Sequence, residues 1–489
     1  MNPPATACLA LDQGTLSSRA LLYDETGTVL CSASRRITLK RIDAQHVEQD
    51  GVEILASILA VLDEVLAAQQ ATRVNIKSAG LATQRSSILA WQPSSGKVLS
   101  PVLSWQDTRA ADWLSGFESQ AELIQAKTGL RLSPHYSVSK MQWLLQHNRN
   151  VQQALAQQDC VITPLASYLL YHLTDQQHIQ IDIANACRSL LCNLQQRDWD
   201  AQLLQLFSMP PALLPECRPI SYNYGTIKQT GIPITAVNGD QTAALYSDGE
   251  PASQALRVNL GTGAFVLTPV TKPLLEIPAF TRSGLLAGIA SSNQNAASYY
   301  IEGTVNGAAS AIQWLQQCYP DMDVSQILLT KLSGDGQQAV FINAVGNIGS
   351  PLWRSDIKAH FIDRQGIQSD PQQAVIAVLE SIVFLLTMNI QSMLRIKTGL
   401  QQIDISGGLS NQDYVCQALA NLSGFEVARS QDTEATARGI AWLSSPDTDN
   451  WKAGRIEKSW LPLTDEALQR RYRQFKQYLK DVFGMDIQV

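Results

Sequence analysis

The chain has 489 residues, of which 45% are hydrophobic and 16% charged, and its formal net charge at pH 7 is -6. This length exceeds what one hydrophobic core usually organises, so two domains are expected. The negative charge excludes a general attraction for nucleic acid or for an anionic membrane surface, and we expect neither as a partner.

Cysteine usage and hydropathy point to a cytoplasmic protein. The eight cysteines are scattered and form no Cys-x-x-Cys pair, which predicts reduced core thiols. No basic segment follows Met1, so no signal peptide is expected. The most apolar stretch, 374–394, is interrupted by Glu380, and the uncharged run from there to Arg395 is too short for a membrane span, so a buried helix is expected.

The first part of the chain predicts alternating strands and helices. Short apolar runs at 8–11, 20–23 and 29–33 are bounded by Gly and Asp residues and predict strands in a hairpin or meander. A strand at 74–84 follows a helix at 51–70, whose expected apolar face consists of Val52, Leu55, Ile58, Leu59 and Leu62. This order indicates an α/β fold with a mixed sheet.

Two distant segments share one pattern. Residues 8–24 and 256–270 each read as an apolar strand, a Gly-Thr turn and a second apolar strand, which suggests two halves built on one plan. A polar stretch with Gly and Pro at 244–254 suits a boundary between them. We therefore expect domains at 1–247 and 248–489, facing each other across a cleft with a nucleoside triphosphate held between the two Gly-Thr hairpins.

Asp12 ends the first predicted strand, where a buried carboxylate is costly unless it has a partner. The loop 13–18 that follows supplies backbone N–H groups and hydroxyls, and Gly14 allows the close approach that phosphate oxygens require. We expect Asp12 to face a Mg²⁺ ion bound to those oxygens, since magnesium typically uses one or two carboxylates. The alternative is that Asp12 caps the turn with its own side chain.

Several motifs together resemble the FGGY carbohydrate kinases, most closely the glycerol kinase branch. The resemblance runs in the family's order from residue 8 to about 445 and is carried by "ALDQGTLSSRALLYD", "GLATQRSS", "SWQDTRAA", "GLRLSPHYSVSKMQWLL", "NGDQTAALY", "NLGTGAF", "GAASAIQWL" and "ISGGLSNQDYVCQALANLSG". It implies two ribonuclease-H-like lobes of the actin, hexokinase and Hsp70 superfamily, with mixed sheets around a central cleft. It also implies ATP- and Mg²⁺-dependent phosphorylation of a hydroxyl on a polyol or sugar.

The segment 232–246 reads as a strand that becomes a helix, which places Asp240 at the carboxyl end of the strand, where open α/β sheets bind ligands. An aspartate there can take the proton of an acceptor hydroxyl, although a helix N-cap is the alternative. The resemblance implies that Asp240 is the catalytic base.

The resemblance also implies an acceptor pocket. Arg85, Trp105, Tyr136, Asp240 and Gln241 match residues that line the glycerol pocket in the family, but Ser86 stands where glycerol kinases have a glutamate that accepts from glycerol hydroxyls. Losing that carboxylate removes a selective contact and frees volume. We therefore predict a substrate other than glycerol, such as a larger polyol or a ketose.

The nucleotide residues are also carried over from the family. They are Gly14, Thr15, Ser17, Arg19, Gly261, Thr262, Gly263, Gln313, Gly407, Gly408 and Gln412. Four departures bear on ATP affinity: Leu16 replaces a usual threonine in the phosphate loop, Arg354 replaces an acidic residue, and Ala309 and Gln412 stand near positions that are glycine and asparagine in glycerol kinases. A helix starting near Glu434 is expected to pack behind the pocket.

A second class of function stays open at this stage. A nucleotide clamp of the Hsp70 or actin type, or a kinase-derived ligand sensor, would use the same fold without turning over an acceptor. Asp240 beside the acceptor residues favours the kinase. The sequence leaves open the identity of the sugar or polyol, the hydroxyl that is phosphorylated, the pathway, and the oligomeric state, for which a homodimer is the candidate.

Overall fold

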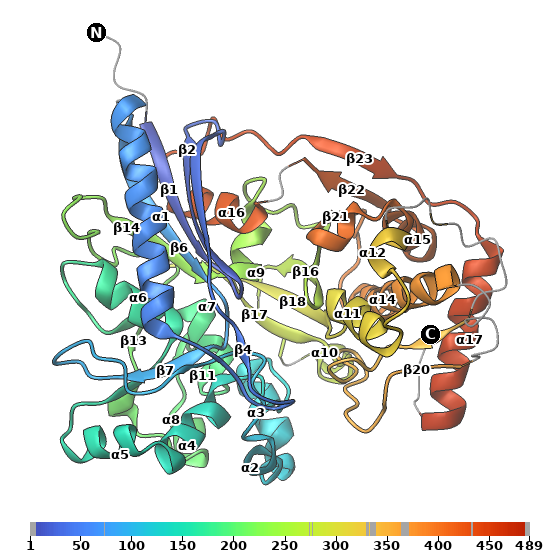
Figure 1. The fold of residues 1–489 in the computed structure, drawn as a ribbon, viewed down its shortest axis with the longest axis horizontal. Helices are drawn as coiled ribbons and strands as arrows, with labels where there is room; N and C mark the ends of the chain where they lie inside the picture. The colour runs from blue at the N-terminus through green and yellow to red at the C-terminus, as the bar shows by residue number, and fades with distance from the viewer. Residues whose placement is uncertain are drawn as a thin grey trace.

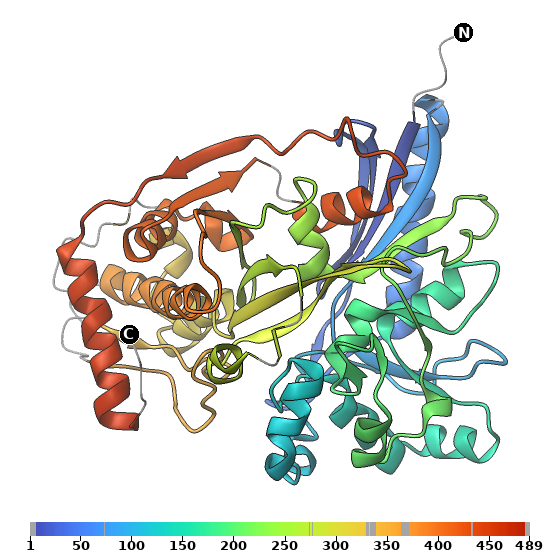
Figure 2. The same cartoon turned by 180° about the vertical axis from the view of Figure 1, so that it is seen from behind.

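The computed structural model describes residues 6–484 except 73, 273, 276, 329–331, 333–338, 363–370, 432 and 433. It has two α/β lobes (Figures 1 and 2), each built on a mixed sheet. The sheet of the N-terminal lobe has the order β14-β6-β1-β2-β3, with β14 at Ile234–Gly239, β6 at Asn75–Thr83, β1 at Thr6–Gln13, β2 at Ser17–Asp24 and β3 at Val29–Arg36. The predicted meander and the strand after the first helix are confirmed.

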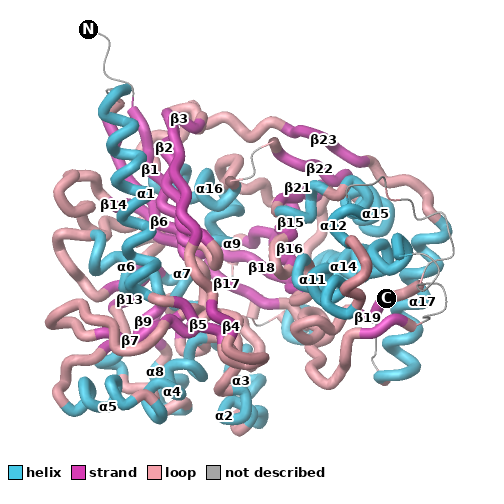
Figure 3. The backbone as a smooth tube through the Cα atoms, viewed as in Figure 1, coloured by secondary structure: helices cyan, strands magenta, loops and turns pink. Residues whose placement is uncertain are grey.

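Strand β1 is buried on both faces, and its side chains alternate between two cores. Leu9 and Leu11 join a core with helix α1 (Gly51–Thr72), whereas Cys8 and Ala10 join one with helix α16 (Ala435–Ser444). Helix α1 packs on β2 and β3 and also contacts β1, and Figure 3 shows it lying along this sheet. This sandwiching explains why the run before Asp12 is apolar at every position.

Helix α1 forms where expected, but its predicted apolar face is only partly right. Ile58 and Leu62 are buried and Leu55 packs against the core, whereas Val52 and Leu59 are 58% and 39% exposed. The buried face also includes Ile54, Val61 and Val65. The apolar residues of this segment are nearly continuous, so they satisfy the helical period in more than one phase.

A second sheet extends the N-terminal lobe. Its order is β4-β5-β8-β7-β9, with β4 at Lys40–Arg41, β5 at Val47–Gln49, β8 at Val102–Leu103, β7 at Ile88–Trp91 and β9 at Val161–Pro164. The helices around it are α2 Ala111–Ser115, α3 Ala121–Thr128, α4 Ser137–His147, α5 Arg149–Ala156, α6 Leu165–Leu173, α7 Ile183–Ala186 and α8 Ala201–Leu206. Short ladders pair β10 (Gln180–Asp182) with β13 (Glu216–Arg218) and β11 (Cys192–Asn193) with β12 (Asp198–Trp199).

The C-terminal lobe repeats the plan of the first sheet. Its order is β17-β18-β16-β15-β21-β22-β23, with β17 at Leu286–Ser292, β18 at Ala297–Val305, β16 at Ala264–Val270, β15 at Ala255–Leu260, β21 at Gln402–Ser406, β22 at Glu426–Ser430 and β23 at Ile456–Trp460. The series β18-β16-β15-β21-β22 has the same pattern of antiparallel and then parallel neighbours as β3-β2-β1-β6-β14. The expected repeat of one plan in two lobes is confirmed.

Helices cover the sheet of the C-terminal lobe, and the longest of them is α14 (Pro371–Leu394). The others in the C-terminal half are α9 Asp240–Ala243, α10 Pro278–Arg282, α11 Ala309–Cys318, α12 Val324–Leu328, α15 Asp413–Ser423 and α17 Glu466–Phe483, with a short ladder of β19 (Phe341–Ile342) and β20 (His360–Phe361). Among the described residues, one helix, Gln372–Leu394, is long and apolar enough to cross a membrane, but 94% of it is buried in the protein.

The charge in the middle of α14 is satisfied inside the core. Glu380 accepts hydrogen bonds from Arg471 of α17 at 2.6 and 2.7 Å and from Tyr414 of α15. The expectation of a buried helix is therefore confirmed.

The chain returns to the N-terminal lobe through α16. This helix follows β22 in sequence, yet it packs on β1, β6 and β14. The buried Arg438 of α16 donates hydrogen bonds to the backbone carbonyl groups of Gly27, Ser247 and Lys452. It thereby holds together the β2–β3 turn, the segment between the lobes and the loop before β23.

The cysteines are all free, as expected, but not all lie in the core. Cys8, Cys160, Cys187, Cys192 and Cys416 are buried, whereas Cys318 at the end of α11 is exposed. The prediction of core thiols is wrong for Cys318 because the helix that carries it lies at the surface.

Candidate active site

Three parallel strands end at one edge of the N-terminal sheet, and a polar residue of the candidate site lies at or just beyond the end of each. Asp12 of β1 lies opposite Ala82 of β6, and Gly239 of β14 lies opposite Thr83. Asp12, Arg85 and Asp240 therefore come together from three separate parts of the sequence. This is the position at which open α/β sheets bind ligands.

A cavity of about 630 Å³ joins this edge to the C-terminal lobe. The predicted residues that line it are Thr15, Arg85, Ser86, Trp105, Tyr136, Asp240, Gln241, Gly261, Thr262, Gly263 and Gln313. Its size is within the range of small-molecule sites. The acceptor residues and the second Gly-Thr hairpin thus share one space between the lobes.

Asp240 is the first residue of α9, after the helix N-cap Gly239, so it is not the cap that the alternative interpretation required. Its Oδ1 atom accepts a hydrogen bond of 2.7 Å from the N–H of Gln241 and lies 3.7 Å from Nε of Arg85. A side chain at Gly239 would meet the Arg85 side chain at 2.6 Å, so glycine lets Arg85 pass. Burial raises the pKa of Asp240 above its ordinary value, and Arg85 acts against this rise.

Arg85 is held by residues that the sequence did not reveal. Its Nη1 atom donates to Glu302 Oε2 at 2.9 Å and to the Tyr300 hydroxyl at 3.1 Å. Glu302 of β18 is fully buried and also accepts from Arg188 at 3.0 Å. Burial opposes ionisation of Glu302, but the two guanidinium groups outweigh it and hold the pKa of Glu302 below its ordinary value.

Aromatic residues form the wall of the acceptor side. Trp105 donates from Nε1 to the Thr15 hydroxyl at 3.0 Å, which joins this wall to the β1–β2 hairpin. Tyr136 is buried at the start of α4, with its ring centroid 5.2 Å from the guanidinium carbon of Arg188. Ser86 has a left-handed backbone conformation with φ of 64°, and its hydroxyl donates to the Arg188 carbonyl at 3.2 Å.

The Asp12 carboxyl, at the start of the β1–β2 hairpin, is a suitable ligand for a cation. Asp12 is 7% exposed, and its Oδ2 atom lies 3.9 Å from Nη1 of Arg19, which pairs more closely with Glu434 at 2.6 Å. Burial raises the pKa of Asp12 to about 7; Arg19 opposes the rise, while Asp240 and Glu434 add to it. In the described part of the chain, this carboxyl accepts no hydrogen bond from the turn that follows it, so the turn-capping alternative is not supported.

The remaining hairpin residues lie close to this carboxyl. The Gly14 N–H donates to the Ser17 carbonyl at 2.9 Å and closes the turn. Leu16, at the tip, is 58% exposed. The residues of this group that do not line the large cavity are Asp12, Gly14, Ser17 and Arg19.

The C-terminal lobe presents its own Gly-Thr hairpin between β15 and β16. The carbonyls of Gly261 and Thr262 accept from the N–H groups of Ala309 and Ala308, both at 3.1 Å, which seats the hairpin on the start of α11. Gln313 projects from α11 into the same cavity.

The paired glycines after β21 lie outside the lining of the large cavity. Gly407 has φ of 90°, and a side chain there would meet the Leu260 backbone oxygen at 2.6 Å, so the close packing of β21 on β15 requires glycine. Gly408 begins a short turn of helix, and Gln412 follows it before α15. Like Gly407, these two residues do not line the cavity.

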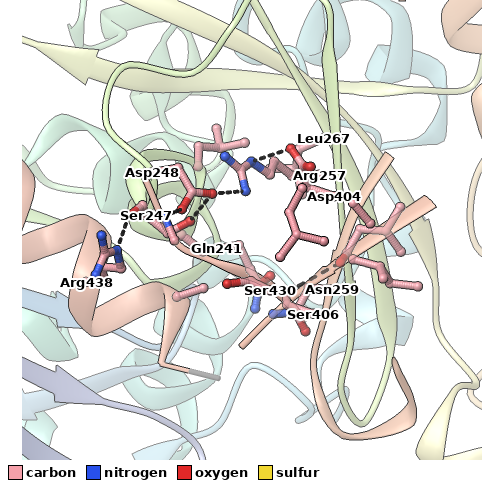
Figure 4. Close-up of a pocket in the computed structure, with 18 residues that line it drawn as sticks. Gln241, Ser247, Asp248, Arg257, Asn259, Leu267, Asp404, Ser406, Ser430 and Arg438 are labelled. Atoms are coloured by element: carbon pink, nitrogen blue, oxygen red, sulfur yellow. Dashed lines mark hydrogen bonds and ion pairs between the residues drawn. The ribbon is translucent and has the colours of Figure 1, made fainter. Parts of the chain in front are cut away.

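A smaller cavity of about 60 Å³ lies beside the segment between the lobes (Figure 4). Asp248 accepts from Arg257 at 2.7 Å and from the N–H of Gly454 at 2.8 Å, and Arg257 also lies 3.4 Å from Asp404. Gln241 and Asn259 line both cavities. Charged contacts on β15 and β21 therefore hold the segment where the chain passes from one lobe to the other.

The structure shows which residues Arg354 contacts and adds one cavity residue that was not predicted. Arg354 pairs with Asp356 at 2.5 Å and donates to the Phe483 carbonyl of α17 at 3.1 Å, so its charge is used within the C-terminal lobe. Its neighbour Trp353 lines the large cavity and was missed.

Arg188 and Glu302 were not predicted as site residues, because each is a single charged residue within an apolar run and belongs to no recognised motif. A lone charged residue in a buried segment needs a partner, and that signal was available in "NACRSLL" and "YYIEGTV". Which residue pairs with which depends on the tertiary structure.

The paired sheets, the cavity between them and the carboxylates at the strand ends define a two-lobed phosphotransferase fold of the actin and hexokinase type. Residues 7–247 match the N-terminal domain, and residues 256–445 the C-terminal domain, of the FGGY family of carbohydrate kinases. The chain belongs to this family.

Individual proteins agree with this assignment. The glycerol kinase of Acinetobacter baylyi is 32% identical over 449 residues, which is 89% of each chain. A glycerol kinase from Plasmodium falciparum with ADP aligns with a TM-score of 0.83 and 24% identity, and a ligand-bound xylulose kinase from Lactobacillus acidophilus with a TM-score of 0.83 and 18% identity; both alignments cover 99% of each chain. The protein is an ATP- and Mg²⁺-dependent kinase that phosphorylates a hydroxyl group of a polyol or sugar.

Proposed function

We propose that Asp240 is the general base of this kinase and that the acceptor is a polyol or sugar other than glycerol. The observation that carries the proposal is the shared cavity, in which Asp240 and Arg85 face the Gly261–Gly263 hairpin of the other lobe. Phosphoryl transfer needs a positioned acceptor, a nearby proton acceptor and compensation of phosphate charge. The cavity offers a residue for each task.

The proposed roles follow from the contacts. Asp240 accepts the proton of the reacting hydroxyl, and Arg85, fixed by Glu302, donates to an acceptor oxygen. Trp105 and Tyr136 enclose the carbon skeleton and limit access of water, which would otherwise compete as acceptor. Gln241 begins α9 beside the base and completes the proposed acceptor set with Ser86, Arg85, Asp240, Trp105 and Tyr136.

The nucleotide side is proposed from the two hairpins. ATP supplies the phosphoryl group, and Mg²⁺ offsets its charge. Asp12 would hold the metal, because a buried carboxylate without a close partner is a ready oxygen ligand. The proposed phosphate and nucleoside contacts are Gly14, Thr15, Ser17, Arg19, Gly261, Thr262, Gly263, Gln313, Gly407, Gly408 and Gln412.

We also propose a division of labour between residues 1–247, which bind the acceptor and carry the base, and residues 248–489, which bind the nucleotide. The helix α16 crosses this division, since it packs on the N-terminal sheet. One chain lines the whole cavity, so the reaction needs no second copy, and a homodimer is a separate proposal. We further propose that the enzyme acts in the cytoplasm on a small molecule, without nucleic acid or membrane.

The substrate proposal rests on Ser86. Its hydroxyl already donates a hydrogen bond to the Arg188 carbonyl. It therefore does not replace the carboxylate that accepts hydrogen bonds from glycerol in the glycerol kinase branch. A pocket that lacks this acceptor loses its selective contact and gains room.

A panel assay tests the proposed function. ADP release and ³¹P NMR are measured with glycerol, tetritols, pentitols, ketopentoses and hexoses, for the wild-type enzyme and for Ser86→Glu. We expect an acceptor larger than glycerol to give the highest kcat/KM, and Ser86→Glu to move the ratio towards glycerol by about tenfold or more. Glycerol as the best wild-type substrate would refute the substrate assignment. Nucleotide binding without phosphorylation of any panel member would instead support a nucleotide clamp.

A further inference from the structure

Glu302 lies between two arginine side chains at the wall of the large cavity. Its Oε2 atom accepts from Arg85 Nη1 at 2.9 Å, and its Oε1 atom accepts from Arg188 Nη2 at 3.0 Å. Arg85 and Arg188 both line the cavity, and Glu302 is fully buried behind them. One carboxylate thus anchors two guanidinium groups that face the same space.

The two guanidinium groups differ in how many of their N–H groups have hydrogen-bond partners. Arg85 also donates to Tyr300 and lies beside Asp240, whereas the Nε and Nη1 atoms of Arg188 are buried and have no hydrogen-bond partner in the described chain. Arg188 is 6% exposed. An arginine side chain cannot shed its proton to escape this situation, so its buried donors call for acceptor atoms.

The position of Arg188 relative to the base suggests which acceptor atoms these are. Arg188 is connected to Asp240 through Glu302 and Arg85, and Arg188, Arg85 and Asp240 all line the cavity. The Tyr136 ring, 5.2 Å from the guanidinium carbon, forms the adjoining wall. A ligand whose reacting hydroxyl is at Asp240 would extend past Arg85 towards Arg188.

The short side chain of Ser86 leaves room for a ligand at this end of the cavity. Its side chain is short and hydrogen bonded to the Arg188 carbonyl, so it offers no carboxylate to the Arg188 donors. The backbone at Ser86, with φ of 64°, fixes the position of this side chain at the end of the Gln84–Arg85 segment.

We propose that Arg188 is a substrate-binding residue that selects acceptors of at least four carbon atoms by donating hydrogen bonds to an oxygen remote from the phosphorylated hydroxyl. This inference rests on the proposed function and specifies its substrate class. The shared chemistry is an acceptor oxygen, which a polyol hydroxyl, a ketose carbonyl or a sugar-acid carboxylate can supply. A carboxylate would bind Arg188 more strongly than the two neutral groups.

Binding measurements test this role separately from turnover. Isothermal titration is carried out with glycerol, erythritol, ribitol, a ketopentose and a pentonate, for the wild type, Arg188→Gln and Arg188→Lys. Arg188→Lys keeps a cation opposite Glu302, so it tests the donors even if Arg188→Gln does not fold. Arg471→Lys is the matched control, because Arg471 is a buried arginine bonded to the buried Glu380 in the other lobe.

The outcomes are distinct. We expect the dissociation constant of the tightest ligand of four or more carbons to rise about tenfold or more in both Arg188 variants, and that of glycerol to change less than about threefold. The inference is overturned if both variants bind every ligand within about threefold of wild type, or if no longer ligand binds wild type more tightly than glycerol does. Absence of phosphorylation of all five compounds would count against the proposed function alone.

Discussion

At the level of single residues, two nearby carboxylates have opposite electrostatic environments: Asp240 lines the large cavity, and Glu302 is buried behind its wall. Glu302 lies between two guanidinium groups, which hold its pKa below the ordinary value, whereas burial raises the pKa of Asp240. Such divergence separates a permanent counter-ion from a group that can take up a proton. This contrast supports Asp240 rather than Glu302 as the base.

Asp12 yields a prediction about magnesium and pH. Burial raises its pKa to about 7 in the ligand-free protein, and only the carboxylate form binds a metal. Metal binding therefore displaces a proton below pH 7, and the contribution of Asp12 to binding falls by about tenfold per pH unit of acidification. Above pH 7 the carboxyl is ionised and the contribution is constant.

The measurement is isothermal titration of MgADP between pH 5.5 and 8.5 with wild type and Asp12→Asn. The ratio of the two affinities cancels the titration of the nucleotide itself. We expect this ratio to climb with pH and to level off above about 7. Asp63→Asn, an exposed change on α1, should behave as wild type. An affinity ratio that is constant over the whole range would exclude Asp12 as the metal ligand.

At the level of elements, α16 joins distant parts of the chain. Arg438 donates to the carbonyls of Gly27, Ser247 and Lys452, and its guanidinium carbon is 5.3 Å from the ring centroid of Trp451. Arg438→Met would leave these three carbonyls without that donor. We expect the free energy of unfolding to fall by about 3 kcal/mol.

Chemical denaturation of Arg438→Met and Arg35→Met compares a buried arginine with an exposed one. The Arg35 side chain is 50% exposed and pairs with Glu64 at the surface, so we expect a loss below about 1 kcal/mol there. Equal losses in the two variants would show that Arg438 does not hold these segments together.

The secondary structure could be predicted to a large extent from the sequence, because Gly and Asp residues bound the short strands of both hairpins. The orientation of α1 could not, since Val52 and Leu59 belong to an apolar run that fits several helical faces. The packing of α16 on the N-terminal sheet also could not be predicted, because it is a contact between segments far apart in sequence.

The residues of the candidate site also fall into two groups, those that could be predicted from the sequence and those that could not. Residues in local motifs, such as Thr15, Asp240 and Thr262, line the cavity as expected. Glu302 and Arg188 appear in no motif that was recognised, and their importance comes from pairing across more than a hundred residues of sequence. Long-range ion pairs of this kind are specified by the fold and not by local pattern.

At the level of the whole molecule, the repeated sheet plan places two Gly-Thr hairpins on opposite sides of one cavity. The second cavity and its ion pairs lie where the chain passes between the lobes, with Asp248 held by Arg257 (Figure 4). This arrangement suits the proposed acceptor site on one lobe and the proposed nucleotide site on the other. The central claim is that Asp240 receives the acceptor proton within this cavity.

The most direct test is single-turnover phosphoryl transfer by Asp240→Asn, with the binding of MgADP and of the acceptor measured in parallel on the same variant. We predict that the rate of transfer falls by about 100-fold or more, the range for a positioned acid–base group, while both binding constants stay within about threefold of wild type. Transfer by Asp240→Asn at close to the wild-type rate would contradict the mechanism.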